Sequence, residues 1–353
     1  MLWGDFLYMK SKSNVTIKDV AKRAGVATST VSRVINNKSL ISEETKEKII
    51  EAMRELNYFP NSLARNFANG NACAIGLVID ANDNNTFSNV FFNKSVFGIE
   101  TVAQNNGYNI LITNGGEEKN GVTSVEKLIL ERKIDGLILP SVMAKKKLIK
   151  KLFELDFPFV ILGEPENFKL ESSWVDINNT QGGELAVNHL IQKGYKRIAF
   201  FSGNPKAIFS QNRLKGYRQA LASAGLSVDE KYIVYCEETP AAGYNLLKEI
   251  FKMPQPPDAV ICSDNIMAFG VLRAAGEMGL LVPKELGVLS FDNYPIAEYT
   301  NPPLTVVDVD TYSLGEQAAS ILIKKIGHEK EVNQQTLIST SIIARESTNL
   351  KGE

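Results

Sequence analysis

The chain is poor in the residues that build disulfides and metal centres. Its 353 residues include three cysteines and two histidines, and the cysteines (Cys73, Cys236 and Cys262) lie far apart without C-x-x-C spacing. A disulfide framework and a zinc site are therefore both unsupported. Long apolar runs are also missing, and Asp5 interrupts the N-terminal segment where a signal peptide needs an unbroken apolar stretch. We expect a cytoplasmic protein with no membrane partner, no metal and no cofactor.

The sequence also lacks the common signatures of catalysis. It contains no P-loop, no G-x-S-x-G and no H-E-x-x-H motif, and neither histidine is paired with a nucleophile. His189 lies in a predicted helix, and the run Asn114-Gly115-Gly116 lacks the spacing of a nucleotide-binding fingerprint. We assign no catalytic residue and expect a binding protein, not an enzyme.

The charge that is present is unevenly distributed. The formal net charge is -1, but the first 70 residues hold 11 basic and 7 acidic residues, whereas the remainder holds 28 basic and 33 acidic residues. A chain of this length is expected to form two or three domains. A basic N-terminal module before a mildly acidic body indicates a nucleic acid partner.

The N-terminal module contains the pattern of a helix-turn-helix. Thr16 can cap a first helix, with Asp19 as the reciprocal partner of a capping box. Gly25 can end that helix in a left-handed turn. Ala21, Gly25 and Val31 then supply a small residue, a tight turn and an apolar anchor.

A second helix is predicted at residues 28–35, and its outer face is small, polar and hydrogen-bonding. Such a helix fits the major groove of DNA, where Arg33 can present its guanidinium fork to guanine or phosphate. From the pattern alone, a helical hairpin with a solvated face remains an alternative. A third helix is predicted to begin after Ser42, with these buried residues: Ile49, Ile50, Met53 and Leu56.

From residue 74 onward, short apolar strands alternate with helices. Strands are predicted, for example, at 74–80 and 159–162 in a first series and at 174–178 and 287–291 in a second. This rhythm predicts parallel sheets covered by helices on both faces. Two similar α/β lobes follow one another, and a ligand is expected in the crevice at the carboxyl ends of the strands.

Polar residues occur where several of these strands end. Arg213, Asp264 and Asp292 combine one fork donor with two carboxylate acceptors. Such a set suits a neutral polyol, because each hydroxyl group both donates and accepts and charged partners strengthen the hydrogen bonds. Surface salt bridges or strand-end turns are the alternative interpretation.

Three strings, TIKDVAKRAGV, TVSRVIN and NYFPNSLAR, occur in order in the N-terminal module. With them, residues 15 to about 347 resemble the lactose-repressor (LacI/GalR) family of bacterial transcription regulators. The resemblance implies a multidomain protein with an all-α helix-turn-helix headpiece and a two-lobed α/β periplasmic-binding-protein-like effector domain. It also implies a homodimer that binds double-stranded operator DNA and a small-molecule effector.

The resemblance divides the chain into four parts. It implies a disordered extension at 1–14, a DNA-binding headpiece at 15–60, a hinge helix and linker at 61–72, and an effector-binding and dimerisation domain at 73–353. In that domain the first lobe would comprise about 73–175 and 306–335, and the second about 176–305 and 336–347. The chain would cross between the lobes near Asp176, Thr305 and Ile338.

The resemblance also places the DNA contacts. Ala27 replaces the serine that is common at this position in the family. We therefore expect a weaker helix cap and one fewer contact to the DNA phosphate backbone. Phe67 stands at the hinge position that inserts into the minor groove, where leucine is usual. Ordinary dimer packing of Phe67 is the alternative. The residues expected to contact DNA are Thr16, Thr28, Ser29, Thr30, Ser32, Arg33, Asn36, Ala64 and Phe67.

In the effector domain, family members bind effector hydroxyls at the positions of Arg213 and Asp292. The Asn-Asp order frequent in one loop is inverted here to Asp264-Asn265, which leaves open which side chain faces the ligand. The segment at 89–92 resembles the family's Asn-Pro-Phe-Phe, where a ring could stack on a sugar or belong to the core. The residues expected to bind effector are Phe91, Phe92, Arg213, Asp264, Asn265 and Asp292.

The segments FPFVILGEP, VDINNTQGG and GYKRIAFFSG resemble the maltose-operon repressors within the family. We therefore expect a repressor of sugar-utilisation genes that is controlled by maltose or a maltooligosaccharide. The alternatives are a cytosolic sugar-binding protein and a regulator triggered by a phosphocarrier protein or a purine.

Overall fold

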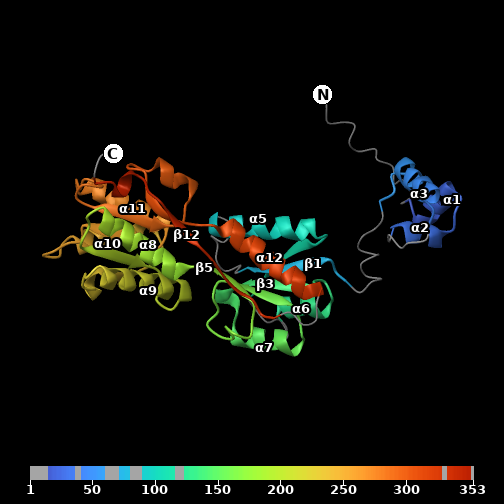
Figure 1. Ribbon diagram of the computed structural model, residues 1–353, viewed down its shortest axis with the longest axis horizontal. Helices are drawn as coiled ribbons and strands as arrows, with labels where there is room; N and C mark the ends of the chain where they lie inside the picture. The colour runs from blue at the N-terminus through green and yellow to red at the C-terminus, as the bar shows by residue number, and fades with distance from the viewer. Residues whose placement is uncertain are drawn as a thin grey trace, which may run out of the picture. The chain divides into compact units, whose positions relative to one another are not determined.

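The computed structural model describes residues 15–35, 41–59, 71–79, 90–115, 123–327 and 332–350 (Figure 1). The chain divides into two compact units, at 1–72 and 73–353. The expected extension at 1–14 and nearly all of the expected hinge lie outside the described residues, and so do Asn36, Ala64 and Phe67.

The first unit contains three helices, α1 (Ile17–Ala24), α2 (Thr28–Ile35) and α3 (Glu43–Glu55). The predicted capping box is present, since the Thr16 amide and hydroxyl donate to the Asp19 carboxylate at 2.8 and 2.7 Å. Gly25 ends α1 with a φ of +69°.

The core of this unit is small, and each helix contributes to it. Val20, Val31 and Ile49 are fully buried at its centre. The expectation that Ile50 is buried is wrong, because its side chain is 42% exposed. Ile49 alone occupies the inward position of that helical turn, and its neighbour in sequence lies about 100° around the helix.

The first lobe of the second unit is built on a six-stranded sheet in the order β11-β5-β4-β3-β1-β2, and every neighbouring pair is parallel. Helices α5 and α12 cover one face, and α6 and α7 cover the other (Figure 1). Alternate residues of the central strands face the two helical layers, as expected for a doubly covered parallel sheet. The elements are β1 (Ala74–Ile79), α5 (Val90–Asn105), β2 (Asn109–Asn114), α6 (Ser124–Leu130), β3 (Gly136–Pro140), α7 (Lys146–Glu154), β4 (Phe159–Leu162), β5 (Trp174–Ile177), α12 (Thr311–Gly327) and β11 (Gln335–Ile338).

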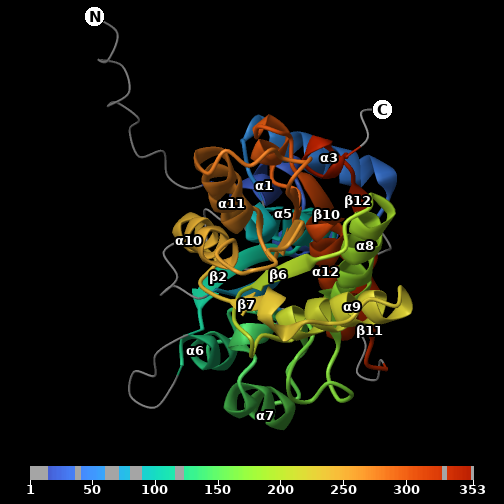
Figure 2. The same cartoon turned by 90° about the vertical axis from the view of Figure 1, so that its left-hand side faces the viewer.

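The second lobe repeats this plan in the order β12-β10-β9-β8-β6-β7, with only the β10–β12 pair antiparallel. Helices α8 and α9 lie on one face and α10 and α11 on the other (Figure 2). The elements are α8 (Asn179–Gln192), β6 (Ile198–Ser202), α9 (Ile208–Ser223), β7 (Ile233–Tyr235), α10 (Pro240–Ile250), β8 (Ala259–Cys262), α11 (Asn265–Glu277), β9 (Gly287–Phe291), β10 (Thr305–Val309) and β12 (Thr340–Ile343). Short 3-10 turns are η2 (Ser141–Met143), η3 (Glu230–Tyr232), η4 (Pro295–Tyr299) and η5 (Glu346–Thr348).

The chain crosses between the two sheets three times. It leaves the first sheet after Ile177, returns to it after Val309, and leaves again after Ile338. The lobe boundaries expected at 175, 305 and 335 are therefore a few residues too early. β10 completes the second sheet before the chain returns, and β11 completes the first sheet before the last crossing.

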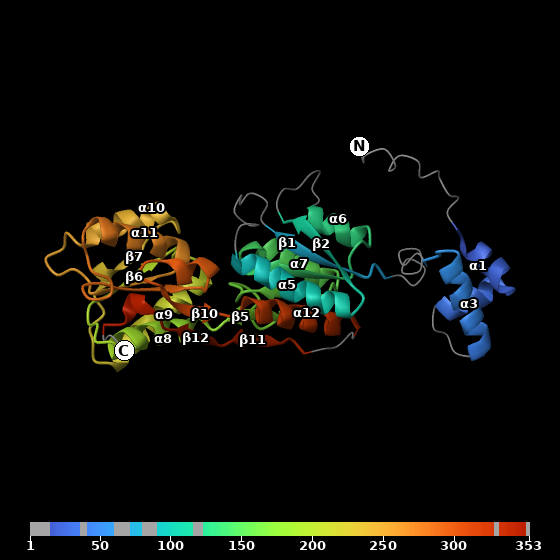
Figure 3. The same ribbon diagram turned by 90° about the horizontal axis from the view of Figure 1, so that it is seen from above.

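Three helix pairs pack so closely that glycine is required at their crossing points. A Cβ atom at any of these glycines would lie between 1.9 and 2.2 Å from a backbone oxygen of the opposing helix. Each helix therefore presents its backbone directly to its partner, as Figure 3 shows for α5 beside α12. The pairs are Gly98 with Gly315 (α5 and α12), Gly183 with Gly216 (α8 and α9) and Gly243 with Gly270 (α10 and α11).

Among the described helices, none combines the length and apolar character needed to span a bilayer.

Candidate functional site

A cleft of about 350 Å³ lies where the carboxyl ends of strands from both sheets meet. Parallel sheets bring these ends to one edge, which is why polar residues distant in sequence converge there. The side chains that carry its chemistry are Phe91, Phe92, Ser141, Glu164, Asp176, Asn179, Phe209, Arg213, Glu238, Ser263, Asp264, Asp292 and Tyr294.

Arg213 is held in one orientation beneath the cleft. It is only 5% exposed, and its guanidinium carbon lies 4.0 Å from the ring centre of Phe291. Its Nε donates to Asn179 Oδ1 at 2.9 Å, and its Nη1 donates to the Ser263 carbonyl at 2.8 Å. Its Nη2 makes no hydrogen bond to a described residue. The guanidinium is therefore held in place by two of its nitrogen atoms, and its Nη2 can donate to a ligand.

Asp292 follows β9, and its side chain is buried at the edge of the cleft. Burial raises its pKa to about 7, although the nearby Arg213 guanidinium acts in the opposite direction. Its Oδ1 is buried and has no hydrogen-bond partner among the described residues. A buried acceptor without a partner costs free energy, so a ligand hydroxyl that reached Oδ1 would form a hydrogen bond that the described residues leave unmade.

Other carboxyl groups lie in the cleft with Arg213 and Asp292. Burial raises the pKa of Asp176 to about 6 and raises that of Asp264 above its usual range. Together with Asp292, Glu164 and Glu238 they make five carboxyl groups in the lining. Arg213 is the one cationic side chain among the described lining residues. Across the described parts of the chain, no group of three or more His, Cys, Asp or Glu residues could hold a metal ion.

Asp264 and Asn265 have separate positions. Asp264 lines the cleft, caps α11 through the Ile266 amide at 2.6 Å and accepts the Tyr294 hydroxyl at 3.1 Å. Asn265 is fully buried and does not line the cleft, so the expectation that it contacts effector is corrected. Its side chain points the other way because it is the first residue of the helix that Asp264 caps.

Phe91 and Phe92 both line the cleft, and both also pack against the core of the first lobe. The two interpretations of this aromatic pair are therefore compatible.

Several cleft residues were not predicted from the sequence. Glu164 and Glu238 follow β4 and β7, so the strand-end rule that singled out Asp264 could have found them. Asp176 lies inside β5, and Asn179 begins the helix after the first crossing. Only the sheet order shows that these two residues reach the same cleft.

The outer face of α2 is a second candidate surface. Thr28, Ser29 and Arg33 are exposed on it, whereas Thr30 and Ser32 are half-buried. The hydroxyl group of Thr16 is engaged with Asp19. The exposed part of this face therefore consists of two small hydroxyl side chains and one guanidinium, a set that can reach base edges and phosphates.

Two protein families match this chain. Residues 16–61 match "Bacterial regulatory proteins, lacI family", and residues 187–348 match "Periplasmic binding protein-like domain". The transcriptional regulator MalR of Streptococcus pneumoniae is 37% identical over 94% of this chain and 99% of its own length. The repressor CytR of Escherichia coli is 32% identical over 96% of this chain and 98% of its own length.

Two solved structures extend the comparison. The complex of the transcriptional regulator CelR with cellobiose has 30% identity and a TM-score of 0.72, covering 94% of this chain and 99% of that chain. The lac repressor dimer bound to operator and an anti-inducer has 24% identity and a TM-score of 0.79, covering 95% and 99%, and supports the fold alone. The expected fold is confirmed, and the near-complete alignment with relatives shows that the chain belongs to the LacI family of bacterial transcription regulators.

Proposed function

We propose that this regulator is a cytoplasmic homodimer that represses sugar-utilisation genes and has no enzymatic activity. A neutral sugar bound in the cleft would control its affinity for operator DNA. The observation that carries the proposal is the composition of the cleft, with five carboxyl groups around one fixed guanidinium.

The charges of the cleft favour a neutral polyol over an anion. A phosphorylated ligand would bring negative charge close to Glu164, Glu238 and Asp264, which like-charge repulsion disfavours. A sugar hydroxyl can donate to an ionised carboxylate and accept from the Arg213 guanidinium. Asp292, with a pKa of about 7, can serve as donor or acceptor near neutral pH.

The cellobiose complex of CelR supports this ligand class, because that structure covers nearly the whole chain. Among sugars, maltose or a maltooligosaccharide is our proposed effector, on the resemblance of three body segments to maltose-operon repressors. Arg213, Asp264 and Asp292 would bind its hydroxyl groups, and Phe91 or Phe92 would stack on a sugar face.

DNA recognition is assigned to the first unit. Thr28, Ser29 and Arg33 would read bases, and Thr30 and Ser32 would lie near phosphates or bases. Thr16 would also lie there, although its hydroxyl already binds Asp19. Asn36, Ala64 and Phe67, which lie outside the described residues, would complete the contacts.

The sugar controls operator affinity if sugar and operator stabilise different arrangements of the two lobes. Each ligand then changes the affinity of the other by the same factor, for which about 5- to 150-fold is typical. The three chain crossings are the segments that such a rearrangement must deform.

Titration calorimetry tests the effector class. The purified full chain is titrated with maltose, glucose, glucose 6-phosphate and adenine. We expect heat from maltose and none from glucose 6-phosphate, and Asp292→Ala should weaken maltose binding to an affinity that is reduced but still measurable. No maltose heat at millimolar concentration would refute the maltose assignment, and heat from glucose 6-phosphate or adenine alone would replace the neutral-sugar class.

A further inference from the structure

We propose that Asn265 is a positioning residue, which holds Asp292 in the conformation that presents its carboxyl group to effector. The inference rests on the proposed effector cleft. Asn265 does not line that cleft, and it acts there through Asp292, which does.

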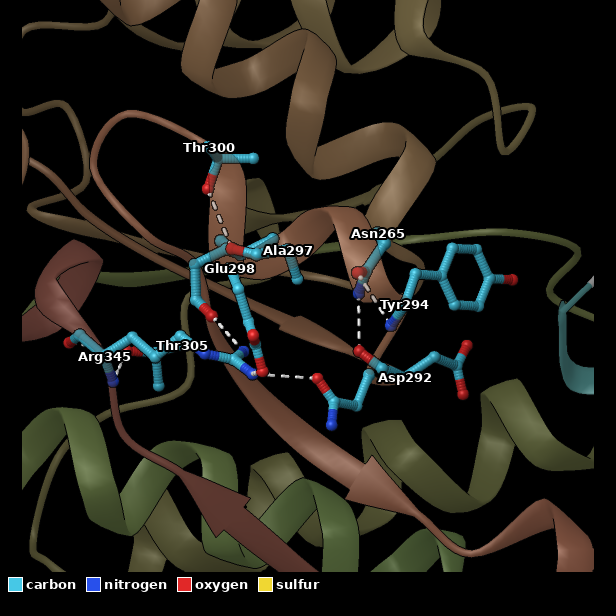
Figure 4. Close-up of polar contacts among 10 residues, drawn as sticks. Asn265, Asp292, Tyr294, Ala297, Glu298, Thr300, Thr305 and Arg345 are labelled. Carbon is cyan, nitrogen blue, oxygen red and sulfur yellow. Dashed lines mark hydrogen bonds and ion pairs between the residues drawn. The ribbon is translucent and has the colours of Figure 1, made fainter.

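The Asn265 side chain connects the end of β9 to the loop that follows it (Figure 4). Its Nδ2 donates to Ser290 Oγ at 2.7 Å and to the carbonyl oxygens of Phe291 and Asp292, both at 2.6 Å. Its Oδ1 accepts from the Tyr294 amide at 3.4 Å. Two carbonyl oxygens on one side fix the orientation of the amide, because a carbonyl can only accept.

The backbone at Asp292 requires such support. Its φ is +68°, in the left-handed region that residues with a side chain adopt uncommonly. The Asp292 amide donates to the Val307 carbonyl at 3.0 Å, and Asn265 holds the Asp292 carbonyl. With both ends of the residue fixed, the direction of its Cα–Cβ bond is fixed, and only rotation about χ1 and χ2 remains to place the carboxyl group.

The next part of the loop is anchored independently. Arg345 donates to Asn293 Oδ1 at 3.0 Å, to the Leu304 carbonyl at 2.7 Å and to Glu298 at 3.1 Å (Figure 4). The loop therefore stays attached to the lobe when Asn265 is changed. The hydrogen bonds lost with the Asn265 side chain are therefore those that hold the end of β9 and the turn at Asp292.

Backbone amide hydrogen exchange measures the loss of these hydrogen bonds in the absence of any ligand. In Asn265→Ala, we expect exchange of the Tyr294 amide to quicken about ten-fold, because its acceptor and the bonds to the turn are removed. Ser290→Ala is the matched control, since it removes one acceptor in β9 and leaves the loop bonds, and we expect a change below about two-fold. If alanine leaves the lobe unfolded, the nearly isosteric Asn265→Leu removes both the donor and the acceptor and gives the same readout. Unchanged Tyr294 exchange in a folded variant would overturn the proposal.

A double-mutant cycle with maltose then separates positioning from general destabilisation. Asn265→Ala should weaken maltose binding about ten-fold in the wild-type background and less than about two-fold in an Asp292→Ala background, since its effect passes through Asp292. Equal effects in both backgrounds would contradict the positioning role. If wild-type protein gives no maltose heat, the maltose assignment fails, while hydrogen exchange still decides the role of Asn265.

Discussion

The buried carboxyl group of Asp292 should make the stability of the protein depend on pH. Because burial raises its pKa from 3.8 to about 7, the folded state keeps a proton that the unfolded chain has already released. The contribution of Asp292 to the free energy of unfolding therefore falls as pH rises from about 4 to about 7.

Asp292→Asn removes that dependence, and asparagine also tolerates the left-handed backbone. We expect the variant to melt at least about 2 °C above the wild type at pH 8, with the difference shrinking toward pH 4. Thermal unfolding followed by circular dichroism across this range measures it, with Glu166→Gln as an exposed control. A variant that melts below the wild type at pH 8 would show that the carboxylate is well stabilised in the fold.

The exposed guanidinium of Arg33 is the headpiece side chain best suited to base recognition. Arg33→Ala should weaken specific operator binding by about 1–3 kcal/mol and leave maltose binding unchanged. Arg54→Ala, which removes the same charge from α3, is the control. Fluorescence anisotropy on the operator at fixed salt distinguishes them. Equal operator affinity for Arg33→Ala and wild type would remove α2 from its proposed role.

At the residue scale, the strand-end pattern predicted Asp264 and Asp292, which follow β8 and β9, whereas Arg213 lies within α9. Arg213, Asp264 and Asp292 were chosen on that pattern or on the family resemblance, and all three line the cleft. Asn265 adjoins Asp264 in sequence, yet it points into the lobe because α11 begins between them. Two residues that are adjacent in sequence therefore differ in position, one in the cleft and one buried. The apolar periodicity of the sequence does not predict this difference.

At the scale of elements, the glycine pairs fix where functional side chains stand. Gly216 lies on α9 with Arg213, and a Cβ atom there would lie 2.0 Å from the Thr180 oxygen of α8. Gly216→Ala must therefore push α9 away from α8 and shift Arg213. We expect a loss of about 1–3 kcal/mol in stability, as for other overpacked cores, together with weaker maltose binding.

Gly276→Ala is the matched control for this change. Gly276 also lies in a helix, α11, and a Cβ atom there meets nothing within 4 Å. Its replacement should raise stability by up to about 1 kcal/mol. Urea unfolding of both variants measures the contrast. Gly216→Ala with wild-type stability would mean that the two helices can separate at little cost.

Elements were predictable where local chemistry decides them. The capping box of α1, the range of α2 and the apolar strands β4 and β9 all follow from short patterns. The glycine pairs were not predicted, because each glycine is required by a helix that lies elsewhere in the sequence. The lobe boundaries were drawn early for the same reason: β10 and β11 belong to sheets whose order is set by tertiary packing.

At the scale of the whole molecule, a sugar-controlled regulator must bind both a sugar and DNA with one chain. The structure supplies a two-lobed domain joined by three crossings and a separate helical unit with an exposed polar helix. Reciprocity of binding free energies makes the coupling between them measurable from either ligand.

The most direct measurement is capture of the DNA bound by this protein across its source genome, followed by operator titration with and without maltose. We expect a near-palindromic site beside sugar-use genes that purified protein binds specifically, and we expect the sugar to lower the affinity for this site by about 5- to 150-fold. No specific DNA at any salt concentration or with any of the tested ligands would contradict it.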